Sequence, residues 1–177
     1  MLIGIAVRLL IPDTTAVSAR RALQGQGLGE LRDLRREVCW EFDAEGDVEA
    51  TAARLLRTDV LVNQNKCRAR WWRGPLEAAD AAAPAGAALP AACLLVEARD
   101  DPELPAMQRV LSARLGFAGL RVLRHATLWL VVGTAGTDGP ELARRAARML
   151  LVNPHGQLGT VLGAGPSPVG GPRATPN

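Results

Sequence analysis

The sequence predicts an α+β fold in which one small module is written twice, and three observations lead to this prediction. Two charged, alanine-rich segments end alike, on Val60-Leu61-Val62-Asn63 and on Leu150-Leu151-Val152-Asn153. A tryptophan lies upstream of each ending. The offset between matching residues is nearly constant, at 88 for Leu23 and Leu111, 89 for Leu31 and Leu120, 89 for Trp40 and Trp129, and 90 for Asn63 and Asn153. Self-similarity at a fixed period marks a repeated unit.

The first half predicts the order strand, helix, one or two strands, helix and strand. Residues 2–10 are nearly continuous apolar with β-branched side chains, as in a strand buried on at least one face. Asp13 then precedes a helical spacing of apolar residues that a glycine-rich segment, 25–29, ends. From Val38 the apolar residues alternate with period two, as in a half-buried strand. The arginine-rich residues 32–37 are predicted to form a strand bend or a hairpin.

Two further elements and a linker follow. Residues 48–56 carry the apolar stripe of a second helix, which we expect to end at Asn63. Residues 67–72 are predicted to form a short last strand. Residues 73–90 are rich in alanine, proline and glycine and predict a linker. As a flexible coil it would span roughly 20 to 25 Å, enough for the second half to fold back on the first.

The second half predicts the same order. Asp101-Pro102 is expected to cap a helix that Gly116 ends. Residues 120–132 are predicted to hold a strand pair, and a second helix is expected to end at Asn153-Pro154. Residues 157–162 are predicted to form the last strand.

These elements define the predicted domain organisation. Two β-α-β(β)-α-β modules, residues 1–72 and 91–162, are expected to pack as an intrachain pseudo-dimer with an antiparallel sheet and four helices. Residues 163–177 are dominated by glycine, proline, serine and alanine and predict a disordered tail.

Composition indicates a soluble globular protein, which we expect in the cytoplasm. The 177 residues are 48% hydrophobic and 22% charged with a net charge of +3. Acidic residues accompany the arginines, unlike the profile of a nucleic-acid-binding protein. No apolar run approaches the roughly 18 to 20 residues of a membrane helix, and residues 1–10 lack a signal-peptide cleavage site. The cysteines lie in or beside apolar strands, as buried thiols do: Cys39, Cys67 and Cys93.

The sequence offers no catalytic constellation. His125 follows an arginine in a predicted strand, and His155 follows a helix end. None of the usual zinc, dithiol, nucleophile-elbow or phosphate-loop patterns occurs. Gly25-x-Gly27-x-Gly29 ends a helix instead of opening one, unlike a dinucleotide fingerprint. We therefore predict no catalytic, metal-binding or cofactor-binding residue in this chain.

Four polar residues at matching positions are the candidate contact residues. Asp13 and Asp101 each precede the first helix of their half, either as helix caps or as residues at a subunit contact. Asn63 and Asn153 each follow the second helix, either as helix stops or as contacts with a partner or with the other half.

Two arginine-rich segments carry further alternatives. The second helices are expected to expose a set of arginines, which form a solvated face or dock an acidic partner: Arg54, Arg57, Arg144, Arg145 and Arg148. Residues 68–73 alternate cations with two tryptophans. The two rings either pack against the other half or the linker, or form a platform for single-stranded nucleic acid.

The order of these motifs resembles the PurS family, the small subunit of the multi-subunit phosphoribosylformylglycinamidine (FGAM) synthase of purine biosynthesis. In the first half the resemblance rests on residues 12–17 through Gly27, 31–35 and 61–63. In the second half it rests on Asp101-Pro102, Leu111, Gly116, 120–124 and 150–154. The first half departs from the family pattern at Gln64, where the family has proline, and the family member is typically a single, self-pairing module.

The resemblance implies a non-catalytic role in a larger enzyme. The family looks like a bridge between a PurL-type synthase subunit and a PurQ-type glutaminase subunit. The complex uses ATP, Mg²⁺ and glutamine, whereas this chain is expected to bind none of them. Two fused copies would supply one dimer from one chain, since fusion makes the association intramolecular. The alternative is a tandem ferredoxin-like or ACT-like regulatory protein that binds a small molecule at the interface of its repeats.

Overall fold

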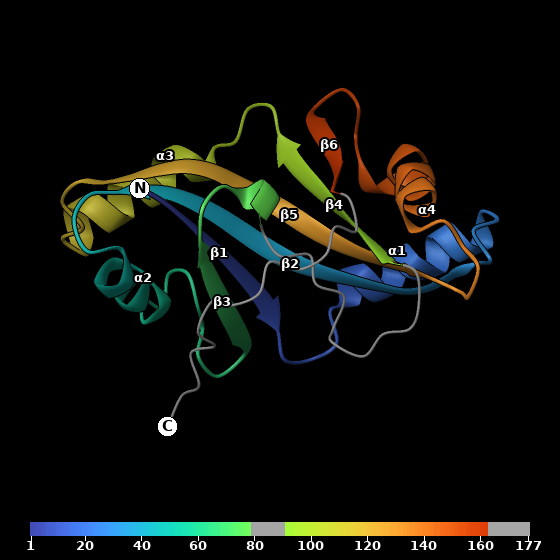
Figure 1. The fold of residues 1–177 in the computed structure, drawn as a ribbon, viewed down its shortest axis with the longest axis horizontal. Helices are drawn as coiled ribbons and strands as arrows, with labels where there is room; N and C mark the ends of the chain where they lie inside the picture. The colour runs from blue at the N-terminus through green and yellow to red at the C-terminus, as the bar shows by residue number, and fades with distance from the viewer. Residues whose placement is uncertain (79–90, 163–177) are drawn as a thin grey trace.

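The computed structural model of the chain describes residues 1–78 and 91–162, which form a six-stranded antiparallel sheet and four helices (Figure 1). The elements are β1 (Leu2–Leu9), α1 (Thr14–Gly25), β2 (Leu31–Ala44), α2 (Val48–Leu56), β3 (Cys67–Arg73), β4 (Ala91–Ala98), α3 (Glu103–Arg109), β5 (Leu120–Gly133), α4 (Gly139–Ala146) and β6 (Gln157–Leu162). The predicted α+β class is confirmed. Within the described ranges, no helix has the length and apolar character needed to cross a membrane.

Two long central strands organise the sheet, whose strand order is β3-β1-β2-β5-β4-β6. β2 and β5 pair along their whole length, and Val38 lies opposite Thr127. The predicted hairpin at 32–37 and the predicted strand pair at 120–132 are therefore wrong, because each segment belongs to one 14-residue strand. A register shift near the start of each long strand explains the error, since a bulge moves the apolar alternation by one residue.

All four helices cover one face of the sheet. On that face Ile5 lies opposite Trp40, and Leu94 lies opposite Trp129. Trp40 belongs to a buried cluster with α2 and α3, and Trp129 belongs to a second cluster with α1 and α4. Figure 1 shows the same arrangement, with α2 and α3 at one end of the sheet and α1 and α4 at the other.

Each cluster takes its side chains from both halves of the sequence. Leu23 of α1 is fully buried with Leu94 of β4 and Leu142 of α4. Leu111, in the π-helical turn η2 (Val110–Arg114) that continues α3, is fully buried with Ile5 of β1. The first helix of each half lies on the long strand of its own half, α1 on β2 and α3 on β5, and the buried cluster around it includes residues of the other half. Neither core is therefore complete within one half.

The opposite face of the sheet carries a third buried cluster, which includes Ala6, Cys39 and Leu95. Leu76 packs on it from a 3₁₀ turn, η1 (Leu76–Ala78), and its backbone N–H donates to Glu41 Oε2 at 2.6 Å. The start of the predicted linker at 73–90 is therefore ordered against the sheet. The remainder of that linker, 79–90, and the predicted tail, 163–177, lie outside the described residues.

The second helices end differently in the two halves. α2 ends at Leu56, seven residues before the predicted end at Asn63. Thr58 caps the helix by donating through its backbone N–H and its hydroxyl to the Leu55 carbonyl. α4 continues through a π-helical turn, η3 (Ala147–Leu151), so its predicted end at Asn153 agrees more closely.

Candidate functional site

The four candidate residues gather in two places, one in each half. The loop before α1 is tied to the turn before β3 by the backbone bond from Leu10 N–H to the Lys66 carbonyl, at 2.8 Å. The loop before α3 is tied to the turn before β6 by the corresponding bond from Arg99 N–H to the Gly156 carbonyl, at 2.9 Å. We call these the first tip (residues 8–13 and 63–68) and the second tip (residues 97–101 and 153–158). The first tip contains Asp13 and Asn63, and the second contains Asp101 and Asn153.

Asp13 joins its helix to the centre of the sheet. Its Oδ1 accepts the backbone N–H groups of Thr15 at 2.9 Å and Ala16 at 3.2 Å, so the predicted helix cap is confirmed. Its Oδ2 accepts Arg36 Nε of β2 at 2.8 Å. The carboxylate is largely buried, with 14% of the side chain exposed, so this ion pair is screened less than a surface pair.

Asp101 makes the corresponding pair in the second half. Its Oδ1 accepts Glu103 N–H at 2.9 Å at the start of α3, and its Oδ2 lies 2.7 Å from His125 Nδ1 of β5. Trp40 stacks on the His125 ring with centroids 4.1 Å apart and an angle of 18° between the planes. Arg36 lies opposite Trp129, and His125 lies opposite Trp40, so each aspartate is anchored to a side chain beside a tryptophan of the other half.

The two asparagines form the same turn. Asn63 Oδ1 accepts Asn65 N–H at 3.1 Å, and Asn153 Oδ1 accepts His155 N–H at 3.1 Å. The Asn63 carbonyl also accepts Cys67 N–H at the start of β3. Both side chains are exposed and serve as turn formers between the second helix and the edge strand. They lie in different tips, so the structure brings each asparagine near the aspartate of its own half and not near the other asparagine.

The geometry of these pairs does not build a nucleophile site. Asp101 orients His125 as a carboxylate orients a general base, but Trp40 covers the ring, and no hydroxyl or thiol hydrogen-bonds to the imidazole within the described part of the chain. The same part of the chain holds no group of three or more His, Cys, Asp or Glu side chains placed to bind a metal ion. Arg36 and His125 were missed by the sequence reasoning, although they share the 89-residue offset that aligned Trp40 with Trp129.

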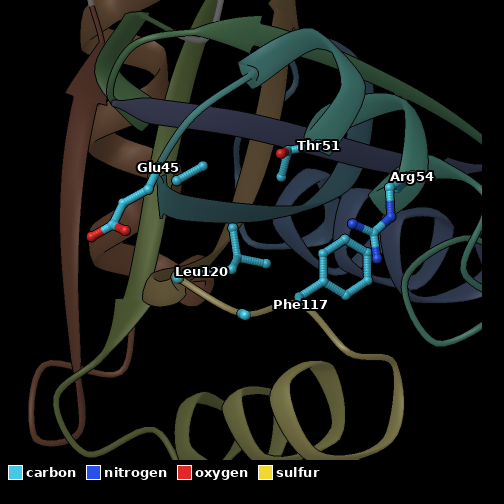
Figure 2. Close-up of a pocket in the computed structure, with 8 residues that line it drawn as sticks. Glu45, Thr51, Arg54, Phe117 and Leu120 are labelled. Atoms are coloured by element: carbon cyan, nitrogen blue, oxygen red, sulfur yellow. The ribbon is translucent and has the colours of Figure 1, made fainter.

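A shallow depression lies elsewhere, between the start of α2 and the loop before β5 (Figure 2). It encloses about 220 Å³, open solvent included, and is lined by Ala44, Glu45, Thr51, Arg54, Phe117, Ala118, Gly119 and Leu120. The guanidinium carbon of Arg54 lies 4.4 Å from the centroid of the Phe117 ring. None of the four candidate residues lines this depression.

The three arginines of α4 and η3 form ion pairs. Arg145 pairs with Glu30, and Arg144 and Arg148 both pair with Glu141. In β3, Trp71 packs against the helix-side cluster, whereas Trp72 lies over Gly4 on the opposite face and donates from Nε1 to the Pro75 carbonyl at 3.0 Å. The two tryptophan rings therefore face opposite sides of the sheet and do not form one continuous platform.

The face of the sheet opposite helices α1 to α4 carries groups whose pKa values are strongly shifted. Arg124 forms a two-pronged bond to Glu97 at 2.7 and 2.8 Å, and this bond raises the pKa of the guanidinium against the opposing effect of burial. Burial, with Glu37 as the next cause, raises the pKa of the Cys39 thiol to about 12. Burial likewise raises the pKa of Cys93 to about 12. Both thiols are therefore protonated and unreactive near neutral pH, as predicted for buried cysteines.

Comparisons with known proteins return no relative. No family model, no curated protein and no solved structure matches this chain. The resemblance to the PurS family therefore stays a prediction from the order of the motifs.

Proposed function

We propose that this chain is a PurS-type assembly subunit in which two fused modules form an intrachain pseudo-dimer. The central register is the observation that carries the proposal. The β2–β5 register is symmetric about Val38, which lies opposite Thr127, the residue 89 positions later. On either side of this centre, Arg36 lies opposite Trp129 and Trp40 lies opposite His125. A twofold symmetric interface pairs residue i with j and j with i in this way.

The packing of the helices supports the same interpretation. Leu23 and Leu111 are both fully buried, and each lies in a cluster built largely from the other half. A core shared in this way by two like units resembles a dimer interface. With the two units fused, their association becomes intramolecular, and the pairing no longer depends on protein concentration.

The proposed role is to bridge a PurL-type synthase subunit and a PurQ-type glutaminase subunit of FGAM synthase, without catalysis by this chain. The contacts of Asp13 and Asp101 hold elements together, since each carboxylate accepts a backbone N–H at a helix start and pairs with a side chain of a central strand. Two corresponding tips on one rigid sheet give a scaffold two related surfaces, which suits the binding of two different partners.

Reconstitution tests this function. The purified chain is mixed with the PurL-type and PurQ-type subunits of the same genome, glutamine, ADP and Mg²⁺, and the mass of the complex is measured by light scattering. We expect the free chain to scatter as one 18.7 kDa unit and the complex to contain one such chain where two single modules would sit. Glutamine-dependent amidation is followed with and without the chain. Full activity in its absence, together with no change in mass, would sink the bridging role.

One observation favours the ligand-binding alternative. The pairs Asp13–Arg36 and Asp101–His125 lie at helix starts beside a strand of the other half, which is where a tandem regulatory module would bind a small molecule. A thermal-shift screen of amino acids and nucleotides on the chain alone tests it. A saturable ligand whose effect is lost in Asp101→Asn, and not in the exposed control Asp100→Asn, would favour this alternative.

A further inference from the structure

The first tip exposes three consecutive apolar side chains. Leu9, Leu10 and Ile11 are 39%, 50% and 60% exposed. Single exposed apolar residues are ordinary on protein surfaces, but a contiguous group with a polar rim marks an interaction site. The group spans the end of β1, whose last residue is Leu9, and the start of the loop before α1.

Three cations lie near Leu10 in the sequence and in the strand pairing, whereas Leu9 lies on the other face of β1 from Arg8, because successive strand side chains point to opposite faces. Arg8 lies opposite Arg68 in the β1–β3 pair, and Lys66 is held beside Leu10 by the backbone bond between the loop and the turn. All three cations are exposed, and within residues 1–78 and 91–162 none of them forms an ion pair. The nearest committed carboxylates, Asp13 and Glu37, are paired with Arg36 and Arg70.

The backbone of the first tip is fixed before any partner arrives. The bond from Leu10 N–H to Lys66, the cap formed by Asp13 and the turn formed by Asn63 hold the loop at three points. A surface that is already ordered loses little conformational entropy when it binds.

The second tip shows that the fold does not require these side chains. Ala98, Arg99 and Asp100 occupy the places of Leu9, Leu10 and Ile11, as the corresponding backbone bonds and strand pairs show. Glu97 occupies the place of Arg8. The same backbone therefore closes with Ala98, Arg99 and Asp100, and the exposed apolar residue of the second tip, Leu158, occupies the place of Arg68. The run of exposed apolar residues beside exposed cations is specific to the first tip.

We propose that the first tip docks an acidic, apolar segment of a protein partner. The proposal deepens the assembly function proposed above by naming the surface that holds one of the partners. Unpaired cations beside exposed apolar side chains complement a segment in which carboxylates flank aliphatic side chains. The tip offers no aromatic ring on which a base would stack, which disfavours single-stranded nucleic acid as the occupant.

Binding by defined variants tests the proposal. The probes are the purified PurL-type and PurQ-type subunits and a synthetic peptide of alternating glutamate and leucine. The apolar variant is Leu10→Asp with Ile11→Asp, the charge variant is Lys66→Gln with Arg68→Gln, and the matched control is Arg99→Asp in the second tip. All of these positions are exposed, so each variant should unfold at the same denaturant concentration as the wild type.

We expect the apolar variant to weaken binding of one subunit about tenfold or more, as at an interface hot spot. The charge variant should weaken binding at low salt and flatten its dependence on salt. Arg99→Asp should change the affinity for that subunit by less than about twofold.

The outcomes distinguish failure of the docking surface at the first tip from failure of the proposed bridging function. Equal binding of a subunit by the wild type and the apolar variant overturns the docking proposal and leaves the bridging function standing. If neither subunit binds the wild type, the bridging function fails. Binding of the peptide then tests whether the first tip is a docking surface. Peptide binding that the apolar variant loses then supports the surface, and no peptide binding overturns it. Binding to phosphatidylglycerol vesicles that is lost in the apolar variant, with no loss toward the protein probes, would make a lipid surface the occupant and also overturn the proposal.

Discussion

Gly4 and Trp72 in the first half occupy the places that Cys93 and Leu162 occupy in the second. Both pairs lie across the junction of an edge strand with its neighbour on the helix-free face. A Cβ atom on Gly4 would lie 2.1 Å from the Trp72 ring, so the large ring requires the missing side chain. In the second half a smaller leucine leaves room for a thiol. The packing constraint therefore acts on the pair and not on either residue.

The aspartate pairs and the tips extend this comparison. Arg36 and His125 differ in size and chemistry, yet both hold an aspartate that caps the first helix. The tips differ without any such compensation, since apolar residues at Leu10 and Ile11 replace polar ones and no contact in the described structure requires them. Differences that compensate one another indicate packing, whereas the uncompensated difference at the tips indicates a surface for a partner.

The largest expected effect tests whether the two halves share one core. Leu23→Ala and Leu111→Ala each remove a fully buried side chain that packs on the other half, which should cost about 2–5 kcal/mol of unfolding free energy. Because both clusters contain both halves, we expect one cooperative transition in urea for each variant, followed by fluorescence and by far-ultraviolet circular dichroism. Two separated transitions, with only one shifted, would show instead that the halves unfold independently.

A smaller effect tests whether the absent side chain of Gly4 compensates for the large ring of Trp72 at the sheet edge. Gly4→Ala should destabilise the protein by about 1–3 kcal/mol and change the tryptophan emission, because the new methyl group displaces the Trp72 ring. Adding Trp72→Leu recreates the arrangement of Cys93 with Leu162, so the double variant should recover most of the loss. The double-mutant cycle measures this coupling. Additive losses in the cycle would contradict the idea that the two residues share one space.

Alkaline pH should weaken the protein through one buried thiol from each half. Burial raises the pKa of Cys39 and of Cys93 from 9.0 to about 12. Above pH 9 the unfolded chain loses these protons while the native protein keeps them, so the unfolding free energy falls as the pH rises toward 12. The slope is about 1.4 kcal/mol per pH unit for each thiol. Cys39→Ala and Cys93→Ala should each remove about half of the slope that both thiols contribute. An unchanged slope in the double variant would assign the alkaline loss to other groups.

The sequence predicted the elements that have a simple period and missed those set by long-range contacts. Residues 2–10 and 157–162 were recognised as strands because their apolar pattern is local. The single strand β2 was divided because its bulge near Arg32 shifts the alternation, and the end of α2 was misplaced because Thr58 caps the helix before the apolar residues end. Which side chains of the other half cover the first helices was not predicted, since an amphipathic stripe does not state what will cover it. Asp13 and Asp101 were predicted at helix starts, but their partners on the central strands, Arg36 and His125, required the register of the sheet.

The smallest expected effect tests whether the turns at Asn63 and Asn153 contribute equally to the stability of the protein. Asn63→Ala and Asn153→Ala each remove an exposed side-chain bond to the backbone N–H two residues on, which should cost about 0.5–1 kcal/mol. The bond from Asn153 N–H to Gln157 Oε1 at 2.8 Å does not involve the Asn153 side chain, so it should survive the substitution. We therefore expect similar losses in urea unfolding. A much larger loss for Asn63, accompanied by faster amide exchange at Leu10, would show that the first tip depends on its turn while the second does not. The Asn63 side chain would then be needed to keep the first tip ordered, whereas the second tip closes the same backbone without the side-chain bond of Asn153.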